Sequence, residues 1–255
     1  MYSSLYRFPA PRDNQRSILA TQAAPPYSSG AVKDIIGIVL SFGFVFAVLG
    51  VAQLLLSRRV VSAPVSRKIV HIGVSHWWLI AWYFFTRPLP AAVGPVCFIV
   101  LNYISYRAHL FRAMEDAVPR KNLGTIYFPI SLLVLVILTF GGPVPLFIGA
   151  IGVLIMGYGD GVAALVGERY GTHHFTLFGQ TKSAEGVAAM FAASFAVVLL
   201  VTAAGSGVSH PAAELLFTAA ATAAFASLIE AVTPFGIDNF TVPILTSLFY
   251  YVVFA

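Results

Sequence analysis

Charged residues are scarce in this 255-residue chain: Asp, Glu, Lys and Arg make up 10% of it, whereas hydrophobic residues make up 58%. A soluble domain is typically about 25% charged, so the chain has too few charged groups to cover a globule in water. Its 21 Phe, 11 Tyr and 3 Trp exclude a disordered chain. We therefore expect a protein embedded in a lipid bilayer.

Cysteine is nearly absent as well. Cys97, inside an apolar run, is the single cysteine, so the chain cannot form an internal disulfide. Residues 1–33 are mostly polar and lack the continuous apolar core of a secretory signal peptide. We expect them to form a flexible tail ahead of one membrane domain at 34–255.

Acidic residues are fewer than basic ones, ten against 15, which gives a net charge of +5 and a pI near 9.4. Such a balance can indicate nucleic-acid binding, but here Lys and Arg cluster at the ends of apolar runs. That placement is typical of a cytoplasmic membrane face or of a bound anionic ligand. We expect no nucleic-acid partner.

Apolar runs of about 20 residues can cross a bilayer as helices. The chain holds eight candidate spans, at 34–56, 69–86, 90–106, 124–140, 143–166, 186–204, 211–232 and 238–254. Three of them are short, which leaves seven or eight transmembrane helices. The predicted fold is all-α, a polytopic membrane helical bundle with one helix broken near Gly157–Gly161, where glycines interrupt the fifth run.

The basic residues separate the predicted loops into two kinds. The first, third and fifth loops together carry ten Lys and Arg, whereas the second, fourth and sixth carry only Arg87. By the positive-inside rule the odd-numbered loops face the cytoplasm, which puts both termini on the opposite side. We expect a multi-pass protein of a bacterial cell membrane with its site on the cytoplasmic side.

Five of the ten carboxylates lie in or beside apolar runs within residues 160–238: Asp160, Glu168, Glu185, Glu230 and Asp238. A charge in the bilayer costs roughly 2.5 to 3.5 kcal/mol, so these residues are candidates for function. Asp160 heads a helical face that continues with Ala164, Gly167 and Gly171. A smooth face lets a phosphate chain approach, although the same stripe also suits close helix packing.

A Gly-rich loop ends in Lys182, Ser183 and Glu185, directly before a long apolar helix. Ser183 is placed to cap that helix, and Glu185 lies in its first turn, where a carboxylate is favoured. Capping does not explain Lys182, whose charge suits a phosphate bound at a helix start.

The second span begins with three groups that can be cationic. Arg67 and Lys68 precede His71 by four and three residues, so all three share one helix edge. Anchoring to the membrane surface explains the first two, whereas His71 lies about one turn into the membrane.

Oxygen ligands meet at the turn before the last span. Glu230 ends one run, Pro234 and Gly236 turn the chain, and Asp238 and Asn239 open the next run. An Asp at a helix start is often only a cap. Glu230 and Asn239 beside it make a cluster of the kind that Mg²⁺ accepts.

In chain order, these segments resemble the CTP-dependent lipid-alcohol kinase family, which includes dolichol, phytol and farnesol kinases and the yeast-type diacylglycerol kinase. The matching pieces are Arg67-Lys68-x-x-His71, Asp160-x-x-Ala163-x-x-x-Gly167-x-x-x-Gly171, Lys182-Ser183-x-Glu185-Gly186 and Glu230-x-x-x-Pro234-x-Gly236-x-Asp238-Asn239 with Pro243. The compact length is closer to the phytol or polyprenol branch than to the dolichol branch. Family members often carry Lys after the position of Gly171, where this chain has Thr172, His173 and His174.

The resemblance implies a kinase that transfers the γ-phosphoryl group of CTP to a membrane isoprenoid alcohol, such as phytol, geranylgeraniol, farnesol or a polyprenol, with Mg²⁺. We hypothesise that Asp160 holds the metal and Asp238 accepts the hydroxyl proton, or the reverse, with Lys182 and His71 completing the catalytic set. The candidate metal ligands are Asp160, Glu185, Glu230, Asp238 and Asn239. The candidate nucleotide-binding residues are Arg67, Lys68, Gly159, Gly161, Gly167, Gly171, Lys182, Ser183 and Gly186.

Three other functions stay open. Diacylglycerol kinase belongs to the same resemblance. Phosphatidate cytidylyltransferase also brings CTP to a lipid, but its signature closes with two aspartates two residues apart, and that pair is missing here because Asp160 is followed by Gly161, Val162 and Ala163. A secondary transporter with a broken helix would carry polar residues in both halves, whereas the cluster here lies mostly in one half.

Overall fold

The computed structural model describes residues 27–108, 124–234 and 236–255. Its helices are α2 (Tyr27–Ser57), α3 (Ala63–Ser75), α4 (Trp77–Phe84), α5 (Pro88–Ala108), α6 (Gly124–Phe140), α7 (Leu146–Leu154), the π-helix η2 (Ile155–Asp160), α8 (Gly161–Tyr170), α9 (Ala184–Gly205), α10 (Ala212–Val232) and α11 (Asp238–Phe254). In these ranges the strands are two short ones, β1 (His174–Leu177) and β2 (Gln180–Ser183). The predicted all-α membrane fold is confirmed.

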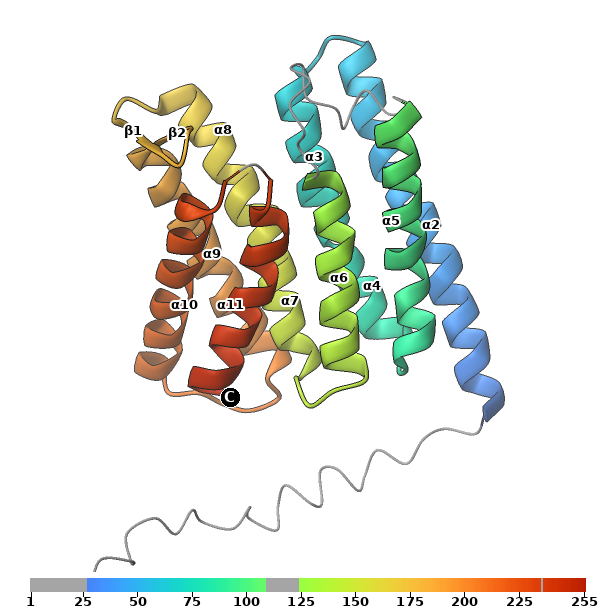
Figure 1. Cartoon of the computed structure of the whole chain (residues 1–255). Coiled ribbons are helices and arrows are strands. Elements are labelled where there is room, and N and C mark those ends of the chain that lie inside the picture. Colours follow the sequence, from blue (N-terminus) through green and yellow to red (C-terminus); the bar gives the residue numbers. More distant parts are fainter. Residues whose placement is uncertain (1–26, 109–123, 235) are drawn as a thin grey trace, which may run out of the picture.

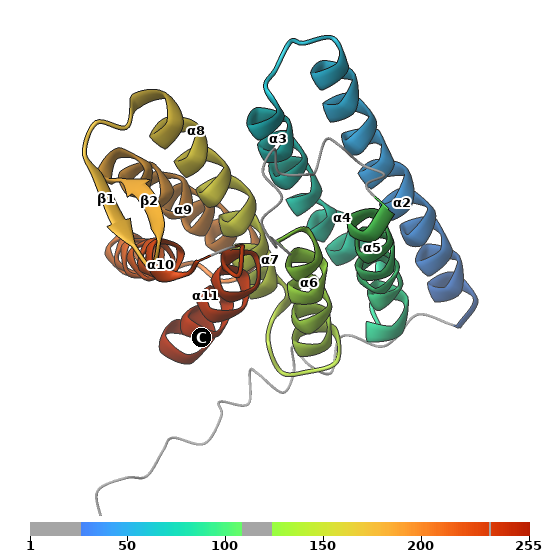
Figure 2. The ribbon, with the colours of Figure 1, turned by 45° about the horizontal axis from the view of Figure 1, so that its top comes forward.

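The helices lie side by side in one bundle (Figures 1 and 2). α7, η2 and α8 stack end to end into one span, Leu146–Tyr170, which is mostly buried, whereas less than half of each of the other four long spans is buried. η2 contacts α3, α7, α8, α9, α10 and α11. The π-helix therefore lies at the centre of the molecule, and its last residue is Asp160.

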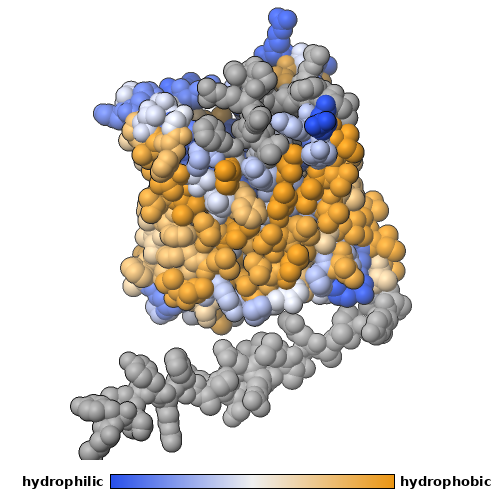
Figure 3. Space-filling view, viewed as in Figure 1, coloured by the Kyte–Doolittle hydropathy of each residue, from blue (hydrophilic) through white to orange (hydrophobic). Residues whose placement is uncertain are grey.

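On the face that Figure 3 shows, the surface is a broad apolar band between two more polar ends. Large apolar side chains point outward along the band; Val39 is 65% exposed and Leu200 is 70% exposed. In water such a surface would aggregate, whereas lipid tails solvate it. Among the described residues, five spans are long and apolar enough to cross a membrane. The other three predicted spans correspond to the α3–α4 pair, α6 and α11.

The second predicted span is two helices, because α3 ends at Ser75 and α4 begins at Trp77. His76 lies between them, and its Nδ1 is 2.8 Å from the carbonyl oxygen of Ile72. The break expected near Gly157–Gly161 is a π-helical turn, not an unwound segment. Gly157 lies so close to Ser75 that a Cβ atom would collide with its hydroxyl group, so the glycine lets α3 approach η2.

The two ends of the bundle differ in what they carry. The connections after α2, α8 and α10 lie at the end that is uppermost in Figure 1, hereafter the upper end. The beginning of α2 and the C-terminus lie at the opposite end, as expected for an even number of crossings. Arg58, Arg59, Arg169 and Lys182 belong to the upper connections or their flanks.

A hairpin that the sequence pattern did not predict stands between α8 and α9. β1 and β2 pair in antiparallel fashion, with Phe175 opposite Lys182. Phe178 and Gly179 turn the chain with φ angles of 47° and 78°, a backbone conformation that favours glycine at the second position. The hairpin carries Lys182 to the upper ends of the helices.

Candidate active site

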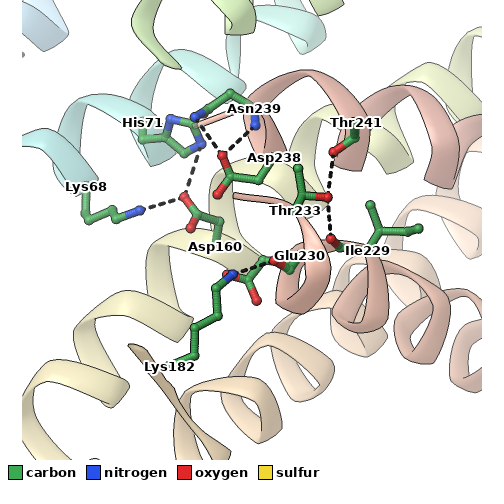
Figure 4. Close-up of polar contacts among 10 residues, drawn as sticks. All are labelled: Lys68, His71, Asp160, Lys182, Ile229, Glu230, Thr233, Asp238, Asn239 and Thr241. Carbon is green, nitrogen blue, oxygen red and sulfur yellow. Dashed lines mark hydrogen bonds and ion pairs between the residues drawn. The ribbon is translucent and has the colours of Figure 1, made fainter. Parts of the chain in front are cut away.

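Asp160 is the first centre of charge in the site. It ends η2 at the middle of the bundle and is only 7% exposed. Lys68 of α3 donates a hydrogen bond of 2.6 Å from Nζ to Oδ2 of Asp160, and Nε2 of His71 lies 3.6 Å from the same oxygen (Figure 4). Because Lys68 and His71 are three residues apart on one helix, both reach the same carboxylate.

Glu230 and Lys182 form the second pair. Nζ of Lys182 donates to Oε1 of Glu230 at 2.5 Å and also to the backbone carbonyl of Glu230 (Figure 4). That carbonyl belongs to the last turn of α10, where backbone oxygens lack helical donors. Lys182 thus caps α10 and neutralises its buried glutamate, which is 7% exposed.

Asp238, the first residue of α11, provides the third carboxylate and follows the turn between α10 and α11. Its Oδ1 accepts from the backbone N–H of Asn239 at 2.9 Å and from Nδ2 of that residue at 3.3 Å. Nδ2 of Asn239 also donates to the carbonyl of Gly236 at 3.2 Å. Asn239 therefore fixes the turn and orients Asp238.

The three carboxylates converge although they come from three different helices. Asp160, Glu230 and Asp238 each offer an oxygen within 4.8 Å of the others. Lys68 and Lys182 balance two of the three negative charges. An added cation would offset the remaining charge, and oxygen-only donors suit a hard divalent cation that keeps several of its waters. These three carboxylates are the structure's candidate metal ligands.

A pocket of about 370 Å³ adjoins this cluster at the upper end of α8 and α9. It is lined by Asp160, Ala163, Ala164, Gly167, Glu168, His174, Thr181, Lys182, Ser183, Gly186, Val187 and Glu230. Its volume is in the usual range for a small-ligand site. The pocket extends from the buried carboxylates to the hairpin, so it can admit a long polar ligand.

Glycine makes the floor of the pocket smooth. A Cβ atom on Gly167 would lie 3.0 Å from Oγ of Ser183, and one on Gly186 would lie 3.0 Å from the carbonyl of Ala163. Ser183 caps α9 as expected, accepting from the N–H of Gly186 at 3.1 Å. The small residues thus serve close packing of α8 on α9 and also leave room above it.

Other candidate residues lie apart from the pocket. Glu185 accepts hydrogen bonds from Oγ1 of Thr172 at 2.6 Å and is 2.7 Å from Nδ1 of His173, so it ties the hairpin base to α9. Gly159 packs against Met190 and Ser194. Arg67, Gly161 and Gly171 are also not among the residues that line the pocket, and neither are Lys68, His71, Asp238 and Asn239 beside the carboxylates.

Three polar residues of the pocket were not among the predicted catalytic, nucleotide-binding or metal-binding residues: Glu168, His174 and Thr181. Glu168 follows Asp160 by eight residues, and this helical spacing could have placed it on the same face. No comparable pattern marks His174 or Thr181, because their position depends on the hairpin.

A part-buried pair, His76 and Tyr158, was missed as well. Nε2 of His76 is 2.9 Å from the hydroxyl of Tyr158 in η2. Because Nδ1 faces the acceptor oxygen of Ile72, Nδ1 holds the proton and Nε2 accepts from Tyr158. The bond joins the α3–α4 junction to the π-helix two residues before Asp160.

Comparison with characterised sequences gives a consistent set of relatives. The chain is 36% identical over 214 residues to a phytol kinase of Synechocystis, which covers 84% of this chain and 89% of the relative. It is 29% identical to a probable chloroplastic phytol kinase of Triticum aestivum over 92% of this chain and 83% of the relative. A probable chloroplastic phytol kinase 2 of Glycine max is also 29% identical, over 91% of this chain and 79% of the relative. No family model matches the chain, and no solved structure does.

Proposed function

The chain belongs to the phytol kinase family of lipid-alcohol kinases, and on that premise we propose that it phosphorylates phytol or a related isoprenoid alcohol with CTP. The oxygen of the alcohol forms a bond to the γ-phosphorus, and the bond from that phosphorus to the β,γ-bridging oxygen breaks. The products are an alkyl monophosphate, CDP and a proton.

One observation carries the proposal: three carboxylates and two lysines meet at the inner end of a pocket in an otherwise apolar bundle. Phosphoryl transfer requires little covalent chemistry from the protein. It depends on positioning and on positive charge around the phosphate oxygens. The cluster supplies metal ligands and cations together, and the pocket supplies room for the donor.

The phosphates of CTP would lie at the inner end, beside Lys182. The capped start of α9 adds backbone N–H groups, and Gly167 and Gly186 let a phosphate chain lie close to the backbone. Asp160 and Glu230 would hold Mg²⁺. When bound, the ion would offset negative charge on the transferring phosphoryl group.

Asp238 is the better candidate for the base. Of the three carboxylates, Asp160 and Glu230 are each bonded to a lysine, whereas the contacts found for Asp238 within the described part of the chain are with Asn239. An ionised Asp238 would accept the hydroxyl proton of the alcohol. His71, whose Nε2 points toward Asp160, would orient that hydroxyl group.

The place of the cluster favours an acceptor dissolved in the membrane. The carboxylates lie near the upper ends of α10 and α11, and the bundle beneath them presents apolar side chains outward. An isoprenoid alcohol can keep its tail in the bilayer while its hydroxyl group reaches this end. We propose that the upper end faces the cytoplasm of a bacterial cell, where CTP is available.

A donor and acceptor panel tests the proposal. The protein would be purified in detergent, reconstituted in lipid nanodiscs, and supplied with Mg²⁺ and CTP, UTP or ATP. The acceptors would be phytol, geranylgeraniol, farnesol, diacylglycerol and phosphatidate. We expect CDP and phytyl or another isoprenyl monophosphate with CTP, and about 100-fold less of both from an Asp160→Asn variant.

The same panel separates the alternatives. Phosphorylation of diacylglycerol alone would identify a diacylglycerol kinase, and a CDP-lipid formed from phosphatidate would identify a cytidylyltransferase. Phosphorylation of the alcohols with ATP and not with CTP would contradict the proposed donor but not the family.

A further inference from the structure

The pocket has two ends of different chemistry. Its inner end contains Asp160, Lys182 and Glu230, whereas its outer end contains Glu168 and the hairpin residues His174 and Thr181. Glu168 is eight residues beyond Asp160, so the two positions are separated by about 12 Å along α8. The spacing of eight also keeps both side chains on one face of the helix.

Between these ends the pocket has a flat floor. Ala163, Ala164, Gly167 and Gly186 line it, and none of them has a side chain larger than a methyl group. A nucleotide whose phosphates lie beside Lys182 would therefore cross this floor and place its base at the outer end. This orientation rests on the proposed function.

The outer end contains one carboxylate, which can only accept hydrogen bonds when it is ionised. Cytosine presents an exocyclic amino group at the edge where uracil presents a carbonyl oxygen. A carboxylate accepts a hydrogen bond from the amino group and repels the carbonyl oxygen. We propose that Glu168 recognises the amino group of cytosine and thereby makes the enzyme prefer CTP to UTP.

The claim concerns cytosine against uracil. Adenine also carries an amino group, so Glu168 by itself does not separate CTP from ATP. Thr181 can donate or accept through its hydroxyl group, and His174 offers a ring that can stack on a base. These two residues would help to hold the base, whereas the carboxylate would distinguish its edge.

A simpler role for Glu168 is charge balance. Arg67 interacts electrostatically with both Asp160 and Glu168. If Glu168 only offset that charge, its removal would change the use of every nucleotide by a similar factor. A comparison of two nucleotides therefore distinguishes base recognition from charge balance.

The test is the ratio of kcat/KM for CTP to kcat/KM for UTP, measured on Glu168→Gln with one isoprenoid alcohol as acceptor. Glutamine keeps the size of the side chain and adds an amide donor that can bond to the uracil oxygen. We expect the ratio to fall by about tenfold or more, the scale of one good contact to a base edge. Because both nucleotides are measured on one preparation, the folded fraction cancels from the ratio.

Glu214→Gln is the matched control. It removes the same charge at the opposite end of the bundle, where Glu214 is 59% exposed and 3.6 Å from His210. The ratio of kcat/KM for CTP to kcat/KM for UTP should be the same in this variant as in the unaltered protein. As a second measurement, CTP should raise the unfolding temperature of the unaltered protein more than UTP does, and Glu168→Gln should remove that difference.

These measurements distinguish a failure of the role proposed for Glu168 from a failure of the proposed nucleotide donor. A Glu168→Gln variant with an unchanged ratio would overturn the proposal, whether kcat/KM for both nucleotides stays the same or falls equally. Loss of activity with both nucleotides in a folded variant would overturn it too, because a base contact is not needed for transfer from UTP. If the unaltered protein phosphorylates alcohols but uses CTP and UTP equally, only the role of Glu168 fails. If it uses neither, the proposed donor fails.

Discussion

Lys68 and Asp160 are 92 residues apart in the chain, yet Nζ of the lysine and Oδ2 of the aspartate are 2.6 Å apart. The pair joins α3 to the end of the central π-helix. Since Asp160 also lies near Glu230 and Asp238, this one bond connects the first half of the chain to the carboxylate cluster of the second half. Both halves are therefore needed to form the site.

Asp160→Asn should abolish most of the activity while leaving an inserted, folded protein. The substitution keeps the size of the side chain but removes its charge, so we expect kcat to fall by about 100-fold or more, the scale of losing one group that stabilises charge in the transition state. Initial rates over a Mg²⁺ titration would measure it. Full activity at ordinary Mg²⁺ concentrations would show that Asp160 is not a catalytic residue.

Lys182→Met should affect both stability and catalysis, and a double variant separates the two effects. Loss of the lysine leaves Glu230 buried without its partner, which costs about 3 to 5 kcal/mol for a buried pair. Adding Glu230→Gln should restore much of the unfolding temperature, because no unpaired charge is left. The double variant should still lack activity. If it recovers activity with stability, Lys182 serves the fold alone.

Tyr158→Phe tests whether the bond from η2 to His76 positions Asp160. We expect kcat to fall several-fold with little change in KM for the nucleotide, since Tyr158 does not line the pocket. Tyr250→Phe is the control, because it removes a second hydrogen-bonded tyrosine hydroxyl, which is buried and lies 3.1 Å from Oγ1 of Thr202. Buried polar bonds in membrane helices average ~0.6 kcal/mol, so both variants should lose similar stability. Equal kinetics in the two variants would argue against a positioning role.

Gly167→Val should block the floor of the pocket. Even one added carbon at Gly167 would lie 3.0 Å from Oγ of Ser183, and the valine methyl groups would extend above it. We expect KM for the nucleotide to rise at least about tenfold, which corresponds to about 1.4 kcal/mol of lost binding free energy. Gly43→Val on α2 is the control, since nothing lies within 4 Å of a Cβ atom there. A normal KM for Gly167→Val would place the nucleotide elsewhere.

The sequence predicted the site residues best where charged residues interrupt apolar runs. Asp160, Glu230 and Asp238 stand out because a carboxylate in a membrane span is costly, and the structure brings all three together. Lys68 was found as one of three potentially cationic groups on one helix edge, and Lys182 as a cation at the end of a Gly-rich loop. The pairing of each lysine with one particular carboxylate was not predictable, because it depends on how α3 and the hairpin pack against distant helices.

The conformation of Gly157–Gly161 and the role of Glu185 could not be predicted from the sequence. The pattern around Gly157–Gly161 predicted an interruption, but glycine content alone does not distinguish an unwound segment from a π-helical turn. Gly157 packs against Ser75, and Tyr158 forms a hydrogen bond with His76. Each of these partners is 82 residues away in the sequence. Glu185 was predicted as a metal ligand, yet Thr172 and His173 hold its carboxylate at the hairpin base. The predicted tail at 1–33 lies largely outside the described residues, and α2 begins at Tyr27.

The pocket leads from the carboxylate cluster toward the upper end of the bundle, so the product would be made on that side of the membrane. An alcohol with a small neutral head can cross from one leaflet to the other, whereas a phosphorylated head cannot pass the hydrocarbon without a large desolvation cost. Phosphorylation at the upper end would therefore trap the lipid in the leaflet where it was made. Any enzyme that consumes the monophosphate must reach it from that same leaflet, or a separate transporter must move it.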